Sequence, residues 1–394
     1  MTLPPPDAYA LQWHPGMQRI DKAAWNRLAV PLETPFLEWE WLSLMETSGS
    51  ISPETGWHPC HLTVHRAGRL VAAAPLYVKT HSSGEFVFDY VWAQAAARMG
   101  LRYYPKLVGM VPVTPLAGYR FLMDSGENAS ALSRLMLSAI DRFCEANALS
   151  GSHFLFIAPA VRKLFHDGGY LEWRHQSYRW ANAGYRGFED YLSRFNTNQR
   201  RNIRRERRAL SAAGISLSVH GGRDLPPGAY ARMHAYYART NDKFGLWGCK
   251  YLTPDFFAGL SDAFGRRLVF VSATEAGRMP VDPVAMAMFV RKGLWLYGRY
   301  WGGARDIPAL HFNACYYTPI AWAIDNGVRF YDPGMGGEHK LRRGFVSVLN
   351  FSVHRFRDGR LRRLMAAHID EINRLETAEI KAQNARLPLV RGGR

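Results

Sequence analysis

The sequence contains little cysteine. Its 394 residues include four, which lie far apart and form no Cys-x-x-Cys pair: Cys60, Cys144, Cys249 and Cys315. This scatter argues against a disulfide framework and against a zinc site. We therefore expect no bound metal and a reducing cytosolic environment.

Long apolar runs are also absent. None approaches the roughly 18 residues that a membrane-spanning helix needs. The longest run, Leu70–Val78, contains Pro75 and suits a strand better. The first residues, MTLPPPDAYA, lack the basic and apolar parts of a secretory signal. These features predict a cytoplasmic protein without a transmembrane segment.

Several catalytic signatures are missing from the sequence. It has no Gly-x-Ser-x-Gly elbow, no His-Glu-x-x-His, no Gly-x-Gly-x-x-Gly and no Gly-x-x-x-x-Gly-Lys-[Ser/Thr]. These absences argue against a hydrolase, a metalloenzyme, a dehydrogenase and a P-loop protein.

Acidic residues are fewer than basic ones. The sequence has 33 Asp and Glu against 50 Lys and Arg, a formal net charge of +17. This excess favours anionic partners: phosphates, nucleic acid or, as a peripheral contact, an acidic membrane surface. Arg-rich proteomes also contain basic proteins without such partners, so charge alone leaves both interpretations open. A content of 47% hydrophobic and 21% charged residues is typical of globular chains.

The two halves of the chain contain a weak repeat. It comprises the segments HLTVHRAGRLVAAAPLYVKTHSSGEFVFDYVWA and LVFVSATEAGRMPVDPVAMAMFVRKGLWLYGRYWGG. Each predicts a hairpin around an Ala-Gly-Arg turn (Ala67–Arg69, Ala276–Arg278), a basic turn at Lys79 or Lys292, and then an aromatic strand.

A helix and a returning strand follow in each half. Helical spacing of apolar residues predicts a helix over Ala129–Asn147, before a strand at His153–Ile157. The second half repeats this with a helix over His311–Asn326, ended by Gly327, and a strand at Val328–Tyr331. The expected fold class is α/β (α+β), with two mixed, mostly antiparallel sheets flanked by helices.

The domain boundaries follow from these patterns. The length suits two domains. The repeat ends before ANAGYRG, so we place the joint near 178–187 and the domains at 1–178 and 179–360. The remaining residues, 361–394, are expected to form a polar helix and a tail.

One predicted helix is unusually basic. Asn198–Arg208 reads NQRRNIRRERR, with Asn196 or Thr197 as its cap and Gly214 as its end. Arg pairs well with phosphate, so Arg200, Arg201 and Arg204 are candidate donor-binding residues. A solvated surface is the equal alternative.

The aromatic strand Leu294–Gly303 is interrupted by Gly298 and by Gly302–Gly303. Glycines in a strand often mark a bulge or a close backbone approach, and a splayed strand can offer N–H groups to a developing oxyanion. Arg299 is a candidate for donor binding, and Tyr300 and Trp301 for substrate binding. His311, in the next helix, is a candidate general base.

The segment GEHKLRRG follows a glycine turn made by Gly334, Gly336 and Gly337. Glu338 and His339 can relay a proton from an amine, and Lys340 can bind phosphate or carboxylate. A charged surface loop is the alternative.

The first half contains a group of acids, aromatics and a lysine. Its members are candidates for binding a polar ligand with sugar or peptide character: Glu85, Asp89, Tyr103, Tyr104 and Lys106. A salt-bridge network between domains is the alternative.

The sequence resembles the FemAB-like peptidoglycan biosynthesis/recognition family of the GNAT acyltransferase superfamily. The resemblance runs from about Pro35 to His354, through PFLEWEWLSLMETSGSISPETGWHP, EFVFDYVW, RYYPKLVG, RRNIRRERR, YGRYWG, LHFNACYY and GEHKLRRGF. It implies tandem GNAT-like domains and an acyl or aminoacyl transferase. It also implies acyl-CoA or aminoacyl-tRNA as co-substrate, no tightly bound cofactor, and a small-molecule or peptidoglycan-precursor amine as acceptor.

We expect direct transfer between donor and acceptor held between the two halves, without a covalent enzyme intermediate. The superfamily's acyl-CoA pattern is not matched in GGARDIPAL after Trp301. Two other hypotheses therefore stand: a non-catalytic GNAT pair that binds cell-wall precursor or RNA, and an RNA-binding protein led by the basic helix.

Overall fold

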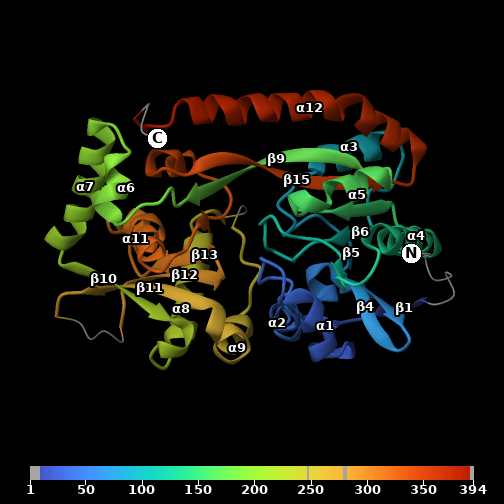
Figure 1. The fold of residues 1–394 in the computed structure, drawn as a ribbon, viewed down its shortest axis with the longest axis horizontal. Coiled ribbons are helices and arrows are strands. Elements are labelled where there is room, and N and C mark those ends of the chain that lie inside the picture. Colours follow the sequence, from blue (N-terminus) through green and yellow to red (C-terminus); the bar gives the residue numbers. More distant parts are fainter. Residues whose placement is uncertain (1–8, 246–247, 278–281, 391–394) are drawn as a thin grey trace. The chain divides into compact units, whose positions relative to one another are not determined.

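The computed structural model describes residues 9–245, 248–277 and 282–390. The chain forms two compact units: unit 1 is residues 1–176 with 349–378, and unit 2 is residues 177–348 with 379–394 (Figure 1). The first boundary thus lies just before the predicted joint. The C-terminal segment is shared between the units. Arg278, in the second predicted turn, lies outside the described residues.

Unit 1 contains two groups of strands. The order β1-β3-β4-β7 forms an antiparallel sheet. A second run, in the order β15-β8-β6-β5-β2, is antiparallel except for the parallel pair β6–β8. The strands are β1 Tyr9–His14, β2 Trp57–Pro59, β3 His61–Arg66, β4 Arg69–Ala74, β5 Tyr77–Lys79, β6 Lys106–Gly109, β7 Leu122–Met123, β8 Gly151–Phe154 and β15 Val346–Phe356.

Helices cover these strands. They are α1 Lys22–Ala29, α2 Trp39–Thr47, α3 Tyr90–Arg98, α4 Ala129–Ala146, α5 Arg162–Asp167 and α12 Gly359–Ala385, with 3-10 turns at Met17–Arg19, Pro53–Thr55 and Pro159–Val161. Helices α3 and α12 share one apolar cluster, in which Trp92 and Ala96 pack with Met365 and Ile369. Its burial of aromatic and aliphatic surface stabilises this side of unit 1.

Unit 2 contains a sheet of order β10-β11-β12-β13-β14-β9, antiparallel except for the pair β13–β14. Its strands are β9 Leu171–Ala181, β10 Ile215–Gly221, β11 Leu268–Glu275, β12 Ala285–Lys292, β13 Trp295–Gly303 and β14 Phe330–Asp332. Strand β9 begins in unit 1 and ends in unit 2, and β15 runs the other way.

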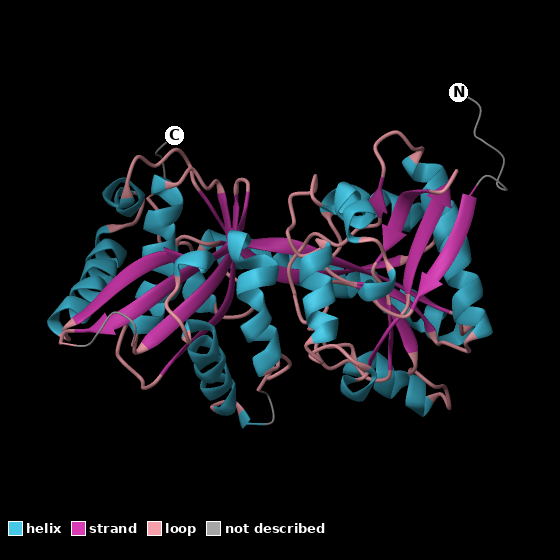
Figure 2. Ribbon diagram, turned by 90° about the horizontal axis from the view of Figure 1, so that it is seen from below, coloured by secondary structure: helices cyan, strands magenta, loops and turns pink. Residues whose placement is uncertain are grey.

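The helices of unit 2 lie on both faces of its sheet, which appears in Figure 2 as a twisted fan of strands. They are α6 Phe188–Ser193, α7 Thr197–Ala212, α8 Ala229–Asp242, α9 Pro254–Phe264, α10 Leu310–Phe312, a π-helical turn Asn313–Tyr317 and α11 Thr318–Asp325; 3-10 turns lie at Gly222–Asp224, Gly265–Arg267 and Glu338–Arg343.

Alternate residues of the unit 2 strands point to opposite faces, as the period of a strand requires. On one face, Ala287 and Phe289 join Leu310 and Ile320 in the core beneath the α10–α11 segment. On the other, Phe270 meets Tyr230 of α8 at 5.5 Å between ring centroids. The sheet is therefore buried on both sides.

Most elements predicted for the second half are confirmed. Helix α7 starts after Asn196, whose side chain accepts a hydrogen bond from Gln199 N, and Gly214 follows its end at φ 68°. The predicted helix over His311–Asn326 is present but contains the π-helical turn. The predicted final strand, Val328–Tyr331, is present at Phe330–Asp332, so it begins two residues later and ends one residue later than predicted.

One prediction for the first half is wrong. The aromatic segment EFVFDYVW does not form a third strand of the repeat: residues 80–89 are irregular and α3 begins at Tyr90. Asp89 occupies the helix N-cap position, and the alanine-rich stretch after it has high helix propensity. No helix in the described part of the chain is long and apolar enough to span a membrane.

Candidate functional site

Strand β13 separates from β14 near its middle. Their parallel pairing ends at Tyr297 and Asp332, whereas β13 continues to Gly303. The pairing of β13 with β12 shifts register there, which leaves Arg299 as the extra residue of a bulge. Among the described strands, none pairs with this edge of β13 beyond Tyr297. The edge can therefore present backbone N–H groups to a ligand, as the glycines of this strand predicted.

Gly302 marks a close approach between β13 and α8. A Cβ atom at this position would lie 2.0 Å from the backbone oxygen of Tyr236. Only glycine fits, because backbone atoms cannot move aside as a side chain can. The close packing that the sequence predicted for this strand is confirmed.

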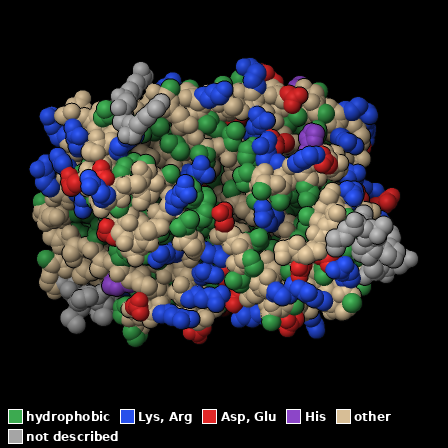
Figure 3. Space-filling model, viewed as in Figure 1, with side chains coloured by type: hydrophobic (Ala, Val, Ile, Leu, Met, Phe, Trp, Pro, Cys, Tyr) green, Lys and Arg blue, Asp and Glu red, His purple; other side chains and the backbone are tan. Residues whose placement is uncertain are grey.

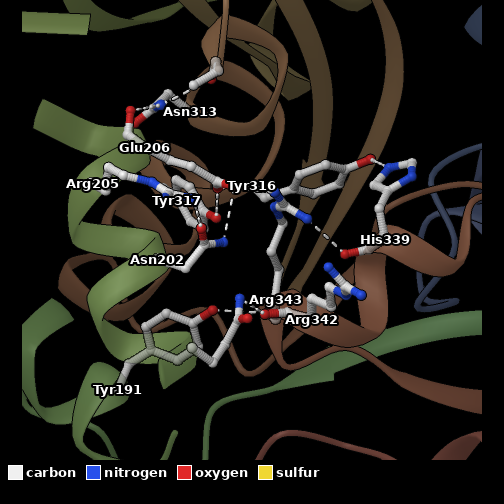
Figure 4. A network of polar contacts seen from close by, with 12 residues as sticks. Tyr191, Asn202, Arg205, Glu206, Asn313, Tyr316, Tyr317, His339, Arg342 and Arg343 are labelled. Atoms are coloured by element: carbon white, nitrogen blue, oxygen red, sulfur yellow. Dashed lines mark hydrogen bonds and ion pairs between the residues drawn. The ribbon is translucent and has the colours of Figure 1, made fainter. Parts of the chain in front are cut away.

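Two of the three predicted catalytic residues lie together in unit 2. The ring centroids of His311 and His339 are 5.7 Å apart, and Trp301 covers His311 at 5.2 Å. The hydroxyl of Tyr316 lies 2.9 Å from His339 Nε2, and Figure 4 shows the two rings turned toward each other. The third predicted residue, Glu338, is exposed at the start of the 3-10 turn.

The two tyrosines of the π-helical turn, Tyr316 and Tyr317, make hydrogen bonds to different partners. Tyr316 contacts His339, whereas the hydroxyl of Tyr317 donates to Glu206 of α7. Asn313, at the start of the turn, donates to the backbone oxygens of Glu206 and Ala309 at 3.1 and 2.9 Å. π-helical turns are rare and often occur at functional sites. This one links the histidine cluster to the basic helix.

Burial and neighbouring cations keep both imidazoles neutral. Burial lowers the pKa of His339 to about 4, with further lowering from Lys340 and Arg343. Burial also lowers the pKa of His311 to about 3, together with His339 and the same two cations. At neutral pH each ring therefore has a nitrogen that can accept a proton.

Lys340 is buried beneath the glycine turn. Its ammonium donates to the carbonyl oxygens of Gly334 and Met335 at 2.7 and 3.0 Å. Burial lowers the pKa of Lys340 to about 8, and Asp332 opposes this. Burial raises the pKa of Asp332 to about 6, opposed by the Gly334 N–H and Lys340. Lys340 therefore holds the turn and places positive charge beside His339.

An ion pair fastens the basic helix to this region (Figure 4). Glu206 accepts two hydrogen bonds from Arg343 Nη2 at 3.1 and 2.9 Å, and a third from Asn202 at 3.1 Å. Arg343 also donates to the His339 carbonyl at 2.8 Å and lies 3.5 Å from the Phe312 ring centroid. The only acid of α7 thus points inward.

The arginines of α7 point mainly outward. Arg200 is half-buried, and the exposed ones are Arg201, Arg204, Arg205, Arg207 and Arg208. Figure 3 shows Lys and Arg side chains gathered at the edge where Figure 1 places α7. An open groove of about 890 Å³ between α7, β10 and α11 is lined by three of them: Arg204, Arg207 and Arg208. Arg204 is paired there with Glu189 at 2.6 Å.

The other candidates from β13 lie on opposite faces of the sheet. Trp301 faces His311, but Tyr300 packs against Tyr237 and Phe257 at 5.2 and 5.8 Å between ring centroids. Arg299 donates to the Tyr300 hydroxyl at 3.0 Å. The structure therefore does not bring Tyr300 to the histidine cluster.

The five candidates of the first half meet in unit 1. Lys106 Nζ pairs with Glu85 at 2.7 Å and with Asp89, and the Tyr103 hydroxyl donates to Asp89 at 2.7 Å. Tyr104 lies against Ser82 at 2.7 Å between hydroxyls. Glu85, Asp89 and Lys106 are each 2% exposed or less. Their charges are satisfied largely by one another, inside one unit rather than between domains.

Sequence reasoning missed Tyr316 and the inward role of Glu206. Tyr316 lies five residues after His311, a spacing that an ordinary helix does not place on one face. Glu206 is the one acid in the arginine-rich run NQRRNIRRERR, and this was the feature of the sequence that could have indicated its inward position. Among the described residues, no group of three or more His, Cys, Asp and Glu could hold a metal ion.

The family is settled by a match over nearly the whole chain. Residues 16–391 match FemAB_like, described as peptidoglycan biosynthesis/recognition. The chain belongs to the FemAB-like family. The resemblance stated from the motifs is thereby confirmed. No curated protein matches this FemAB-like chain in sequence.

Solved structures similar to this FemAB-like protein include the crystal structure of FemX, with 11% identity and a TM-score of 0.51, covering 90% of this chain and 99% of that one. L-PGS from Bacillus licheniformis has 11% identity and a TM-score of 0.49, and the match covers 87% of this chain and 98% of that one. A tandem GNAT protein from the clavulanic acid biosynthesis pathway has 11% identity and a TM-score of 0.45, and the match again covers 87% of this chain and 98% of that one. The FemX likeness supports the fold, and the predicted α/β class with mixed sheets flanked by helices is confirmed.

Proposed function

We propose that this FemAB-like protein transfers an acyl or aminoacyl group to an amine, and that unit 2 contains the reaction site. The observation that carries the proposal is the hydrogen bond between Tyr316 and His339, which orients a neutral imidazole beside His311 and Trp301. The family description favours a peptidoglycan precursor as the source of the amine.

The proposed reaction is a direct transfer. The amine nitrogen attacks the acyl carbonyl carbon, and His339 accepts the proton that the nitrogen loses as the new C–N bond forms. Backbone N–H groups along β13 from Arg299 to Gly302 stabilise the oxyanion. Collapse of the tetrahedral intermediate expels the donor's leaving group as a thiolate or alkoxide, which takes the proton from the imidazolium. Positioning of the two reactants supplies much of the acceleration.

The cations of the site suit a donor that carries phosphate. Burial, with Lys340 and Arg343, lowers the pKa of His339, so that alone it is a weak base. An anionic donor beside the two cations offsets the part of this lowering that they cause and raises the pKa of His339, which makes it a better base. Acyl-CoA and aminoacyl-tRNA both provide such anions, and we propose one of them as co-substrate, with Arg200, Arg201 and Arg204 contacting its phosphates.

The test is a transfer assay that pairs acetyl-CoA, longer acyl-CoAs or charged tRNA with peptidoglycan-precursor amines. The His339→Ala change should lower kcat at least about 100-fold because it removes the proposed base. Tyr316→Phe should lower kcat less and shift its pH dependence, because the imidazole loses its hydroxyl partner.

The matched control is His368→Ala, an exposed histidine of α12, which should leave turnover unchanged. Equal turnover of the wild type and the His339→Ala variant would remove His339 from the mechanism. If no donor is consumed with any acceptor, the transferase proposal itself is wrong.

A second candidate function is RNA binding without chemistry. It is favoured by the five exposed arginines on α7, whose only acid points inward. Replacing Arg201, Arg205 and Arg208 with Gln should weaken RNA binding and reduce its salt slope by about 0.7 per lost phosphate contact. Binding that does not change with salt would contradict this candidate, and donor consumption would show that binding is not the whole function.

A further inference from the structure

Unit 1 exposes three large apolar side chains close together at the start of α3. Phe88 is 64% exposed, Tyr90 60% and Val91 56%. Single exposed apolar side chains are common on soluble proteins, whereas a group of them marks a contact surface. We call Phe88, Tyr90 and Val91 the α3 tip.

Buried ion pairs hold the α3 tip outward. Asp89 lies in sequence between Phe88 and Tyr90, is 2% exposed, and pairs with Lys106. Glu85, 1% exposed, fastens the start of the same segment to Lys106 at 2.7 Å. The segment therefore places its carboxylates inside and its apolar side chains in solvent, the reverse of the usual arrangement.

The backbone of this segment is strained. Phe86 and Phe88 have φ of 59° and 56°. Residues with a Cβ rarely adopt this conformation, and it is kept only where the surroundings enforce it. A glycine at position 88 would relieve the strain but remove the ring. The presence of Phe there points to a role for the exposed side chain.

The charges around the α3 tip are complementary to an anionic partner. Between residues 80 and 123 the sequence has two acids, Glu85 and Asp89, and both are buried. Arg98 and Arg102 are exposed. Arg98 follows Val91 by seven residues, which places it two turns along the same face of α3. The exposed charge of this stretch is thus positive.

We propose that the α3 tip inserts into the interfacial layer of an anionic lipid bilayer, with Arg98 and Arg102 on lipid phosphates. Aromatic rings favour the headgroup level, and nearby cations strengthen binding to acidic lipids. Single-stranded nucleic acid also attracts arginines and rings, but Val91 has no ring on which a base could stack. The proposal concerns unit 1 and does not depend on the chemistry proposed for unit 2.

The test is co-sedimentation of the full-length protein with vesicles of phosphatidylcholine alone or mixed with phosphatidylglycerol. The wild type should bind the mixed vesicles, and the double change Phe88→Ser, Val91→Ser should weaken binding at least about tenfold. The matched control is the pair Leu294→Ser and Leu375→Ser, which removes side chains 52% and 55% exposed elsewhere. This control should bind like the wild type.

A second variant separates lost binding from lost folding. Phe88→Gly removes the ring and also relieves the positive φ, so it should unfold at the same temperature or higher while binding more weakly. The proposal is overturned if the wild type does not bind the mixed vesicles. It is also overturned if both Phe88 variants bind as the wild type does, because surface charge alone then explains the binding.

Discussion

At the scale of single residues, the site depends on positions where only one side chain fits the geometry. Tyr316 reaches His339 because a π-helical turn lies between α10 and α11. Gly302 lets β13 touch the backbone of α8. These constraints arise from atoms far apart in the sequence. The sequence identified the glycine by its place in an apolar strand, whereas nothing in it marks the π-helical turn.

Gly302→Ala should destabilise the protein by about 2 kcal/mol or more, because the new Cβ would overlap the Tyr236 carbonyl and force two packed elements apart. Urea unfolding measures the change. Gly187→Ala is the control: its Cβ meets no atom within 4 Å, and the backbone there is extended at φ −178°. It should change stability by less than about 0.5 kcal/mol. Equal effects of the two changes would contradict the close approach.

At the scale of elements, the basic helix is positioned by polar contacts as well as by apolar packing. Ile203 and Leu210 supply its buried apolar residues, and Glu206 supplies its ion pair. The ion pair between Glu206 and Arg343 is important because the Arg343 side chain is only 3% exposed. The same side chain also donates a hydrogen bond to the His339 carbonyl. The helix therefore contributes to the shape of the histidine cluster.

Glu206→Ala should cost about 3 kcal/mol of unfolding free energy, since it leaves the Arg343 guanidinium buried without its carboxylate. A double-mutant cycle with Arg343→Met, followed by urea unfolding, should show strong coupling. Glu189→Ala breaks a pair whose members are 50% and 69% exposed and should cost less than about 1 kcal/mol. Additive effects of the Glu206 and Arg343 changes would argue against the pair.

The sequence predicted elements best where helix or strand periodicity and end signals agreed. Helix α7 has a clear Asn cap and a glycine end, and its bounds were close to those observed. Helix α3 was mistaken for a strand because the aromatic residues of EFVFDYVW favour strands. The ion pairs of Glu85 and Asp89 with Lys106, which fix that segment, join residues 21 and 17 positions apart. Local propensity cannot reveal such pairs.

At the scale of the whole molecule, the repeat predicted two similar units but not how the chain distributes between them. The sequence suggested a single crossing near residue 178. Instead β9, β15 and α12 each contribute to both units. The histidine cluster, by contrast, was partly predictable, because His311 and His339 each follow a strand of the same sheet.

Stability should fall in acid. Nδ1 of His153 lies 3.0 Å from Nδ1 of His354, and both side chains are buried. Burial lowers the pKa of His354 to about 3 and that of His153 well below its ordinary value. Below about pH 6.5 the unfolded chain therefore takes up protons that the folded chain does not. Each histidine should then lower the unfolding free energy by up to about 1.4 kcal/mol per pH unit, until its folded pKa is reached.

Urea unfolding between pH 7 and pH 4 measures this slope. His354→Gln should reduce the slope by about 1.4 kcal/mol per pH unit, whatever it does to stability at pH 7. His368→Gln, at an exposed position, should leave the slope as it is. A slope that the His354 change does not alter would mean that this histidine titrates normally in the folded protein.

The divided unit 1 has a consequence for synthesis. Its core takes Phe356, Leu361 and Met365 from the far end of the chain, to pack with Trp92 and Tyr103. A ribosome delivers residues 177–348, most of unit 2, before those side chains exist. The unit whose translation begins first therefore stays incomplete until most of the second unit has been made, and its apolar surface remains uncovered during that time.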